Sequence, residues 1–132
     1  RFLIVTNMKN EGPYILEWMA HHLALGFGHV IAVTNDCVDG TDEILQRLQA
    51  LGQVTHLINP AVLDQEKKQW QRRAQRYVQY YPVYAGAEWI LHADVDEFVC
   101  LNDSIRDLST LVERMQPAHA ISMTSMPFSS AN

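Results

Sequence analysis

Three acidic side chains stand close together in the last third of the sequence. Asp94, Asp96 and Glu97 follow the apolar run Trp89–Ala93, which is typical of a buried strand. Side chains two residues apart on extended backbone point to the same side, so we expect Asp94 and Asp96 to present their carboxylates together. Their mutual repulsion lowers stability unless a cation neutralises it. Because hard cations prefer oxygen ligands, the pattern predicts a Mg²⁺ or Mn²⁺ site with Asp94 and Asp96 as ligands.

A divalent cation at this position would have a definite chemical use. It can bridge carboxylates to a diphosphate and stabilise the charge that develops as the diphosphate leaves. An Asp-x-Asp pattern alone occurs by chance in acidic loops, but here it follows a buried strand, which makes it more specific. His92 is in register with the two aspartates on that strand. A metal-associated role is open to His92, although a structural imidazole is the more common outcome.

Two further polar segments follow apolar runs earlier in the chain. Thr6–Gly12 comes after Phe2–Val5, and Asn35–Thr41 comes after Val30–Val33. Ligands of open α/β sheets bind outside the carboxyl ends of the strands, where Asn and Asp can hydrogen-bond a base edge and ribose hydroxyls. For either segment alone, turn formation and helix capping explain the same residues. The candidate nucleotide-binding residues are Thr6, Asn7, Asn10, Glu11, Asn35, Asp36, Asp39 and Asp94.

Strand-like and helical patterns alternate along the chain, which predicts an α/β fold. Apolar runs predict strands at Phe2–Val5, Val30–Val33, Val54–Ile58, Trp89–Ala93 and Ala120–Met123. Helical spacing predicts helices at Tyr14–Phe27, Asp42–Leu51, Gln65–Tyr81 and Ile105–Met115. We expect a three-layer sandwich with helices on both faces of a mostly parallel sheet. Thr41 is the expected cap of the second helix, and Asn102 or Asp103 that of the fourth.

The composition indicates one globular domain spanning residues 1–132. The chain has 132 residues, of which 48% are hydrophobic, and it carries a formal charge of -5, which argues against nucleic acid as a partner. No apolar run has the length of roughly 20 residues that a membrane-spanning helix needs. The two cysteines, Cys37 and Cys100, lack CxxC spacing. Reduced thiols and a cytoplasmic location, including the inner face of a membrane, are therefore expected.

The two ends of the chain suggest a segment of a longer protein. Arg1 rather than Met begins it, and a strand-like run starts almost at once. The last residues, 127–132, have the composition of a loop. We therefore expect a partial catalytic domain that is truncated at its C-terminus.

Taken together, these segments resemble the family-2-like glycosyltransferases, which have the GT-A fold. The similarity covers most of the chain, from Phe2 to about Val99, and lies in the order and spacing of several motifs. The motifs are Asn10-Glu11, Asn35-Asp36, Asp39-Gly40-Thr41 and the run Trp89–Phe98. The resemblance implies a Rossmann-like domain that binds a nucleotide-diphosphate sugar, with a UDP-sugar favoured.

The resemblance also implies roles for individual residues. Asp94-Val95-Asp96 is similar to the DxD element, which holds Mn²⁺ or Mg²⁺ against the diphosphate. Asp96 is then the direct ligand, and Asp94 is placed for the ribose or a metal-bound water, while the segments Thr6–Glu11 and Asn35-Asp36 surround the nucleoside. The expected reaction is sugar transfer to an acceptor hydroxyl, on a glycan or a lipid. The catalytic base of inverting relatives lies well beyond the DxD, and the catalytic residue here is unknown.

Other enzyme classes fit the sequence less well. A sugar-phosphate nucleotidyltransferase needs a glycine-rich first loop, and Thr6–Glu11 contains no glycine. A dinucleotide-binding dehydrogenase needs GxGxxG, which is absent. An aspartyl-phosphate phosphatase needs its aspartate pair after the first strand, where Asn7 and Asn10 stand. The alternative that stays open is a non-catalytic module that binds a nucleotide or a protein.

Basic residues cluster in the predicted third helix. They are Lys67, Lys68, Arg72, Arg73 and Arg76. One of them can contact a phosphate, since Arg favours bidentate binding, but a solvated helix face is the usual meaning of such a run.

Overall fold

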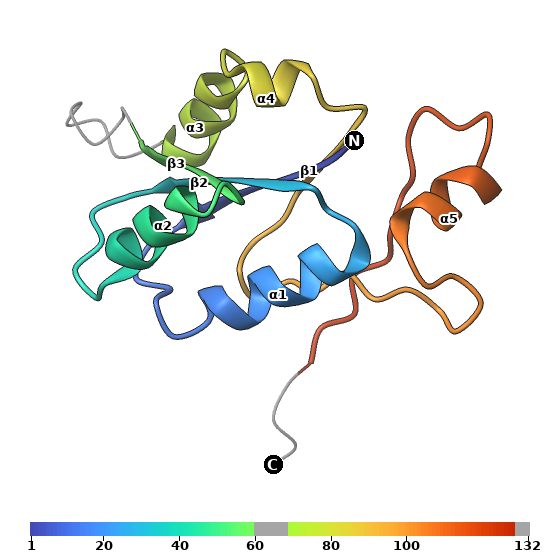
Figure 1. Ribbon diagram of the computed structural model, residues 1–132, viewed down its shortest axis with the longest axis horizontal. Coiled ribbons are helices and arrows are strands. Elements are labelled where there is room, and N and C mark those ends of the chain that lie inside the picture. The colour runs from blue at the N-terminus through green and yellow to red at the C-terminus, as the bar shows by residue number, and fades with distance from the viewer. Residues whose placement is uncertain (60–68, 129–132) are drawn as a thin grey trace.

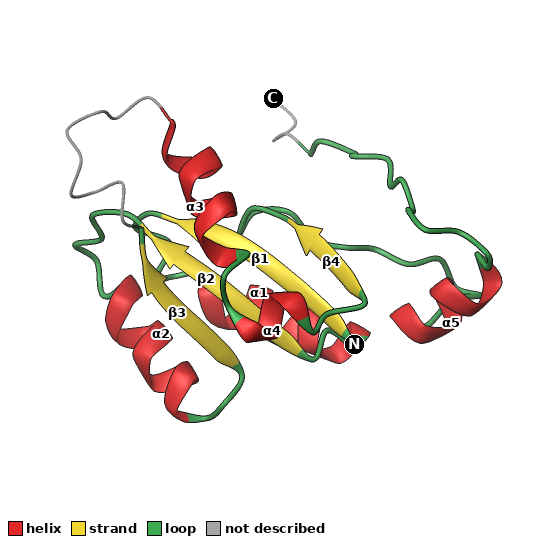
Figure 2. Ribbon diagram, turned by 90° about the horizontal axis from the view of Figure 1, so that it is seen from above, coloured by secondary structure: helices red, strands yellow, loops and turns green. Residues whose placement is uncertain are grey.

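A single parallel sheet forms the centre of the molecule. The computed structural model describes residues 1–59 and 69–128, and all elements below belong to these ranges. The strands are β1 (Phe2–Met8), β2 (His29–Thr34), β3 (Val54–Ile58) and β4 (Trp89–His92). They pair in the order β3-β2-β1-β4, and every pairing is parallel (Figure 2). The predicted α/β class is confirmed.

Helices cover both faces of the sheet. Helices α1 (Ile15–Leu25) and α2 (Thr41–Ala50) lie on one face, and α3 (Trp70–Val78) and α4 (Pro82–Ala85) lie on the other (Figure 1). Two separate apolar clusters reflect this layering: Trp18 and Leu45 belong to the first, whereas Ala74 and Val78 belong to the second. The short helix α5 (Leu108–Arg114) stands to the side, with Leu108 packed into the first cluster. The three-layer arrangement is thus the one that the alternating pattern predicts.

Strand β1 is longer than predicted. It continues beyond Val5 to Met8 because β2 pairs with it along its whole length, up to the pair Met8–Thr34. Thr6 and Asn7 therefore lie within the sheet, whereas the sequence placed them in the loop that follows. The next backbone bond, from Asn35 N–H to the carbonyl of Met8 at 3.0 Å, extends the β1–β2 contact by one residue.

The helix starts differ from the predicted caps. Thr41 is the first residue of α2 rather than its cap, and the preceding residue, Gly40, has a φ of 90° that favours glycine. Helix α5 begins later than predicted and is capped by Asp107, whose side chain accepts from Thr110 N–H, and not by Asn102 or Asp103. A capping side chain acts only if the chain turns into a helix there, and residues 102–106 do not.

Two other predicted elements also change. The third helix was predicted at Gln65–Tyr81, but α3 ends at Val78 and the chain turns into α4 at Pro82. Residues 65–68, with Lys67 and Lys68, lie outside the described residues. The predicted strand Ala120–Met123 is irregular in the structure, because no strand of the described part pairs with it. Among the described residues, no helix combines the length and apolar character needed to cross a bilayer.

The packing of α2 gives a test of the first core cluster. Leu45 is 0% exposed on the inner face of α2. We expect Leu45→Ala to lower the free energy of unfolding by about 2–5 kcal/mol, because it leaves a cavity in a close-packed layer. Urea unfolding measures the change, with the exposed neighbour substitution Gln46→Ala as the matched control. Equal effects of the two substitutions would contradict the placement of α2.

Candidate functional site

Two loops at the carboxyl edge of the sheet are joined by three hydrogen bonds. One loop follows β1 and the other follows β2. Val38 N–H donates to Asn10 Oδ1 at 2.8 Å, and Gly12 N–H donates to Asp39 Oδ2 at 2.9 Å. Glu11 N–H donates to the Thr41 hydroxyl at 2.9 Å. The two polar segments that the sequence indicated therefore form one connected surface.

The loops reach this arrangement through residues that tolerate unusual backbone angles. Asn10 and Asp36 adopt left-handed conformations, with φ of 57° and 46°, and Asn and Asp are the non-glycine residues that enter this region most readily. Gly12 is needed for a different reason. A Cβ at this position would lie 3.1 Å from Asp39 Oδ2 and 3.2 Å from the Asp39 carbonyl oxygen. The absence of a side chain at Gly12 allows the two loops to approach.

Asp39 has a structural role in this contact. Its Oδ1 accepts from the Thr41 amide at 3.1 Å and from the Thr41 hydroxyl at 2.6 Å, while Oδ2 accepts from Gly12. These bonds, the Thr41 hydroxyl first, lower the pKa of Asp39. Both carboxylate oxygens are thus engaged within the protein, and contact of Asp39 with a nucleotide stays a prediction.

The acidic segment after β4 forms a turn. Glu97 N–H donates to the Asp94 carbonyl at 3.1 Å, and Asp94 N–H donates to Glu97 Oε2 at 2.9 Å. The extended backbone that the sequence suggested for this segment is therefore wrong, because β4 ends at His92 and the chain bends at once. Val95 is 3% exposed, whereas the side chains of Asp94 and Asp96 are exposed. The turn keeps both carboxylates available to a ligand while Val95 anchors it in the core.

Electrostatics link this acidic turn to the first loop. Burial raises the pKa of Glu11, and the charges of Asp96, Asp39 and Asp94 raise it further. The pKa of Asp94 is also raised, by burial first and then by Glu97 and Asp96. Carboxyl groups from three loops thus repel one another at one edge of the sheet. Glu11, Asp94 and Asp96 therefore lie near enough to one another for their charges to interact.

Three predicted residues present buried polar atoms near the same edge. Thr6 and Asn35 are 1% and 6% exposed, and Asn7 is half-buried. Thr6 Oγ1, Asn7 Oδ1 and Asn35 Oδ1 have no hydrogen-bond partner in the described part of the chain. Because side chains alternate along β1, Thr6 and Asn7 lie on opposite faces of the sheet and cannot contact the same group together. Thr6 offers almost no surface to a ligand, so its predicted contact does not fit this conformation.

The residue set fits a divalent cation in its chemistry. Exposed carboxylates that repel one another are suitable oxygen ligands, and Mg²⁺ is usually held by one or two carboxylates together with substrate phosphates. Within residues 1–59 and 69–128, no group of three His, Cys, Asp or Glu side chains is arranged to hold a metal ion. Asp94 and Asp96 would therefore need the oxygens of a bound diphosphate to complete the coordination.

Helix α1 contributes side chains that the sequence analysis did not single out. Trp18 is buried, and its indole N–H donates to the Glu97 carbonyl at 2.9 Å. The Nε2 atom of His21 lies 2.8 Å from the carbonyl oxygen of Val99. Together with His22, these side chains share one face of α1, at spacings of three and four residues. Polar atoms on an otherwise apolar face were the signal that could have identified this contact.

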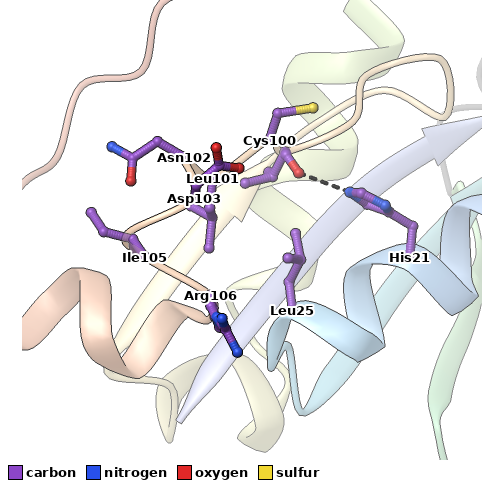
Figure 3. Close-up of a pocket in the computed structure, with 9 residues that line it drawn as sticks. His21, Leu25, Cys100, Leu101, Asn102, Asp103, Ile105 and Arg106 are labelled. Carbon is purple, nitrogen blue, oxygen red and sulfur yellow. Dashed lines mark hydrogen bonds between the residues drawn. The ribbon is translucent and has the colours of Figure 1, made fainter.

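A cavity of about 590 Å³ opens beside this contact (Figure 3). Its walls come from residues 99–103, 105 and 106 and from His21 and Leu25 of α1, and Figure 3 shows His21 bonded to the opposite wall. None of the predicted nucleotide-binding residues lines it. The cavity is therefore separate from the edge where the three loops meet.

Comparison with known proteins identifies the family. The sequence profile of glycosyltransferase family 92 matches residues 7–132. No curated protein matches the chain at a significant level. The expected glycosyltransferase assignment is thus confirmed at the level of the enzyme class, whereas the finer likeness to family 2 stays a prediction.

Two solved structures have a similar fold. The crystal structure of S. aureus TarS has a TM-score of 0.60 and 14% sequence identity, and the match covers 86% of this chain and 19% of that chain. The crystal structure of S. aureus TarS 1-349 has a TM-score of 0.57 and 15% identity, with coverage of 86% and 31%. At this identity the comparison supports the GT-A-like fold alone. The chain spans less than a third of either matched structure.

The close approach at Gly12 can be tested by substitution. We expect Gly12→Ala to lower the free energy of unfolding by about 1–3 kcal/mol, because the added methyl group pushes against Asp39. Thermal and urea unfolding measure this change. Gly28→Ala is the matched control, since a Cβ at Gly28 meets only the Phe2 carbonyl oxygen, at 3.8 Å. Equal effects would show that the two loops do not depend on this contact.

Carboxylate repulsion predicts a stability gain for Asp96→Asn in metal-free protein. The raised pKa values of Glu11 and Asp94 mean that their negative charges cost folding free energy above those pKa values. Removing the Asp96 charge should therefore raise the urea midpoint at pH 7 and low salt. The gain should disappear below about pH 4, where carboxyl groups are protonated, and shrink with added salt. Asp103→Asn, an equivalent change at an exposed site, should show no such gain.

Proposed function

Because the chain belongs to glycosyltransferase family 92, we propose that it binds a nucleotide-diphosphate sugar at the carboxyl edge of its sheet. A UDP-sugar is the favoured donor. The nucleoside lies along the two joined loops after β1 and β2, and the diphosphate lies against the acidic turn after β4. Sugar transfer to an acceptor hydroxyl, on a glycan or a lipid, is the reaction that this site serves.

The observation that carries the proposal is the meeting of acidic side chains from three loops at the carboxyl edge of the sheet. Glu11 follows β1, Asp39 follows β2, and Asp94 and Asp96 follow β4. Burial raises the pKa of Glu11, and the three aspartates raise it further. Unbalanced negative charge at the carboxyl ends of parallel strands is unfavourable for the protein alone, and a cation that carries a diphosphate removes this cost. Among the described residues, no ion pair joins Glu11, Asp94 or Asp96 to a basic side chain, and a structural role alone does not require this.

Each residue of the site has a distinct role in this proposal. Asp96 and Asp94 hold a Mn²⁺ or Mg²⁺ ion, which stabilises the negative charge of the departing nucleoside diphosphate. Asn35 Oδ1 is buried and has no partner among the described residues, so it contacts the base or ribose only if the loop after β2 moves on binding. Asn10 and Asp36, in left-handed turns, shape the backbone that faces the nucleoside. Asp39 keeps the two loops together.

Among the described residues, we assign no side chain as the base that activates the acceptor. Glu113 is exposed on α5, away from the acidic turn in sequence, and we do not assign it as a base. The matched structures are several times longer than the chain, so the transfer step is proposed for the whole protein. We place that protein in the cytoplasm, including the inner face of a membrane. A module of the same fold that binds a nucleotide or protein without transfer is the second candidate.

Calorimetric titration of UDP with and without Mn²⁺ tests donor binding. We expect UDP to bind the wild type only with the metal, and Asp96→Asn to weaken this binding at least about tenfold, because one of two carboxylate ligands is lost. GDP as a competitor tests the preference for uridine.

A matched variant keeps the result specific. Asp103→Asn makes the same chemical change on an exposed carboxylate beyond the turn, and it should bind UDP like the wild type. Metal-independent binding, or normal binding by Asp96→Asn, would show that the acidic turn does not hold a metal. Transfer of sugar from a UDP-sugar to water or an acceptor by the whole protein would separate the enzyme from a binding module.

A further inference from the structure

His22 is buried at the point where α1 meets the backbone that follows the acidic turn. It is 0% exposed, and both of its ring nitrogens have partners. Nδ1 lies 2.8 Å from the Trp18 carbonyl oxygen, and Nε2 lies 3.3 Å from the amide nitrogen of Val99. The side chain therefore connects one turn of α1 with a residue 77 positions later.

The partners fix the tautomer of His22. A carbonyl oxygen can only accept, so Nδ1 carries the proton and donates to Trp18. Nε2 then has a free lone pair, which accepts from Val99 N–H. Burial lowers the pKa of His22, which favours the neutral ring that this acceptor role needs.

The neighbouring His21 requires the opposite tautomer. Its Nε2 lies against the carbonyl oxygen of Val99, so this nitrogen must carry the proton. Both main-chain groups of Val99 are thus held by adjacent imidazoles of one helix. Residues 97–99 belong to no helix or strand, so side chains must supply these hydrogen bonds.

The packing around His22 leaves the ring little freedom. Its centroid lies 4.5 Å from Trp18, 5.7 Å from Phe27 and 5.9 Å from Phe98, and it is stacked on Phe98 with an interplanar angle of 26°. An apolar side chain would fill this space without the cost of burying two polar nitrogens. The imidazole is therefore used as an acceptor for Val99 N–H, and Val99 lies three residues after Asp96.

We propose that His22 is a positioning residue for donor binding: by accepting from Val99 N–H, it fixes the backbone of the turn that carries Asp94 and Asp96. This inference rests on the proposed function, because it assigns His22 to the diphosphate side of the donor site. His22 itself contacts neither metal nor donor. It acts through Val99, while Trp18 holds the Glu97 carbonyl in the same way.

Two substitutions separate the acceptor from the ring volume. His22→Phe keeps an aromatic ring against Phe98 but has no acceptor, whereas His22→Gln carries an amide oxygen that can accept from Val99 N–H. His29→Phe is the matched control. It removes a part-buried hydrogen bond, 2.8 Å between His29 Nε2 and the Thr55 hydroxyl, at the start of β2 and thus at the opposite edge of the sheet.

The rate of amide hydrogen exchange at Val99, measured without ligand, reports directly on the hydrogen bond that Val99 N–H donates to His22. We expect His22→Phe to accelerate exchange at Val99 at least about tenfold, since a buried N–H loses its acceptor. His22→Gln should restore most of the protection, and His29→Phe should leave it unchanged. The proposal is overturned if exchange at Val99 is the same in His22→Phe and the wild type.

UDP affinity in the presence of Mn²⁺ measures the consequence for the site. We expect His22→Phe to weaken it about tenfold, with rescue in His22→Gln and no change in His29→Phe.

If His22→Phe does not fold, Trp18→Phe provides the second test, because it removes the N–H donor to Glu97 and keeps a ring. An equal loss of UDP affinity in His29→Phe, or no recovery of affinity in His22→Gln, would show that His22 contributes only to overall stability and would overturn the proposal. A wild type that binds no UDP would overturn the proposed function, while Val99 exchange would still decide the role of His22 in the turn.

Discussion

The parallel pairing of β1 with both β2 and β4 is the constraint on which the site depends. Parallel strands place their carboxyl ends at the same edge, so the loops after three strands must meet there. Each loop then brings acidic or amide side chains to a shared surface. Strand β1 extends to Met8, and Asn35 N–H donates to the Met8 carbonyl oxygen. The loop after β2 therefore leaves the sheet only after this hydrogen bond.

The acidic residues at this edge divide into two kinds by their surroundings. Asp39 accepts hydrogen bonds on both oxygens, and these bonds lower its pKa. Glu11 and Asp94 have raised pKa values, since burial and neighbouring charges oppose their ionisation. A carboxylate stabilised by the protein's own donors is structural, whereas one destabilised by its neighbours favours an external cation. The sequence placed both Asp39 and Asp94 among the nucleotide-binding candidates, and this distinction requires three-dimensional contacts.

Sequence patterns predicted the order of strands and helices well, because apolar periodicity reflects burial in a layered sheet. The fold class and the convergence of three loops followed from the rule about strand ends. The predictions that were wrong concern element boundaries and a turn, which depend on contacts between particular residues. Thr6 lies in β1 rather than in a loop because β2 pairs with it. Asp107 rather than Asn102 caps α5 because the helix begins only at Leu108. The turn at Asp94–Glu97 arises from bonds between those two residues, which spacing alone does not reveal.

Helix α1 connects both halves of the proposed donor site. Its N-terminal end follows the loop of Glu11 and Gly12, and its buried face holds the main chain of Glu97 and Val99. A helix with its internal hydrogen bonds intact is stiff, so α1, together with the β1–β4 pairing, helps to fix the loop relative to the turn. The apolar face that packs α1 onto the sheet therefore also controls site geometry. Core residues such as Ile15 and Met19 hold α1 on the sheet and so stabilise this arrangement.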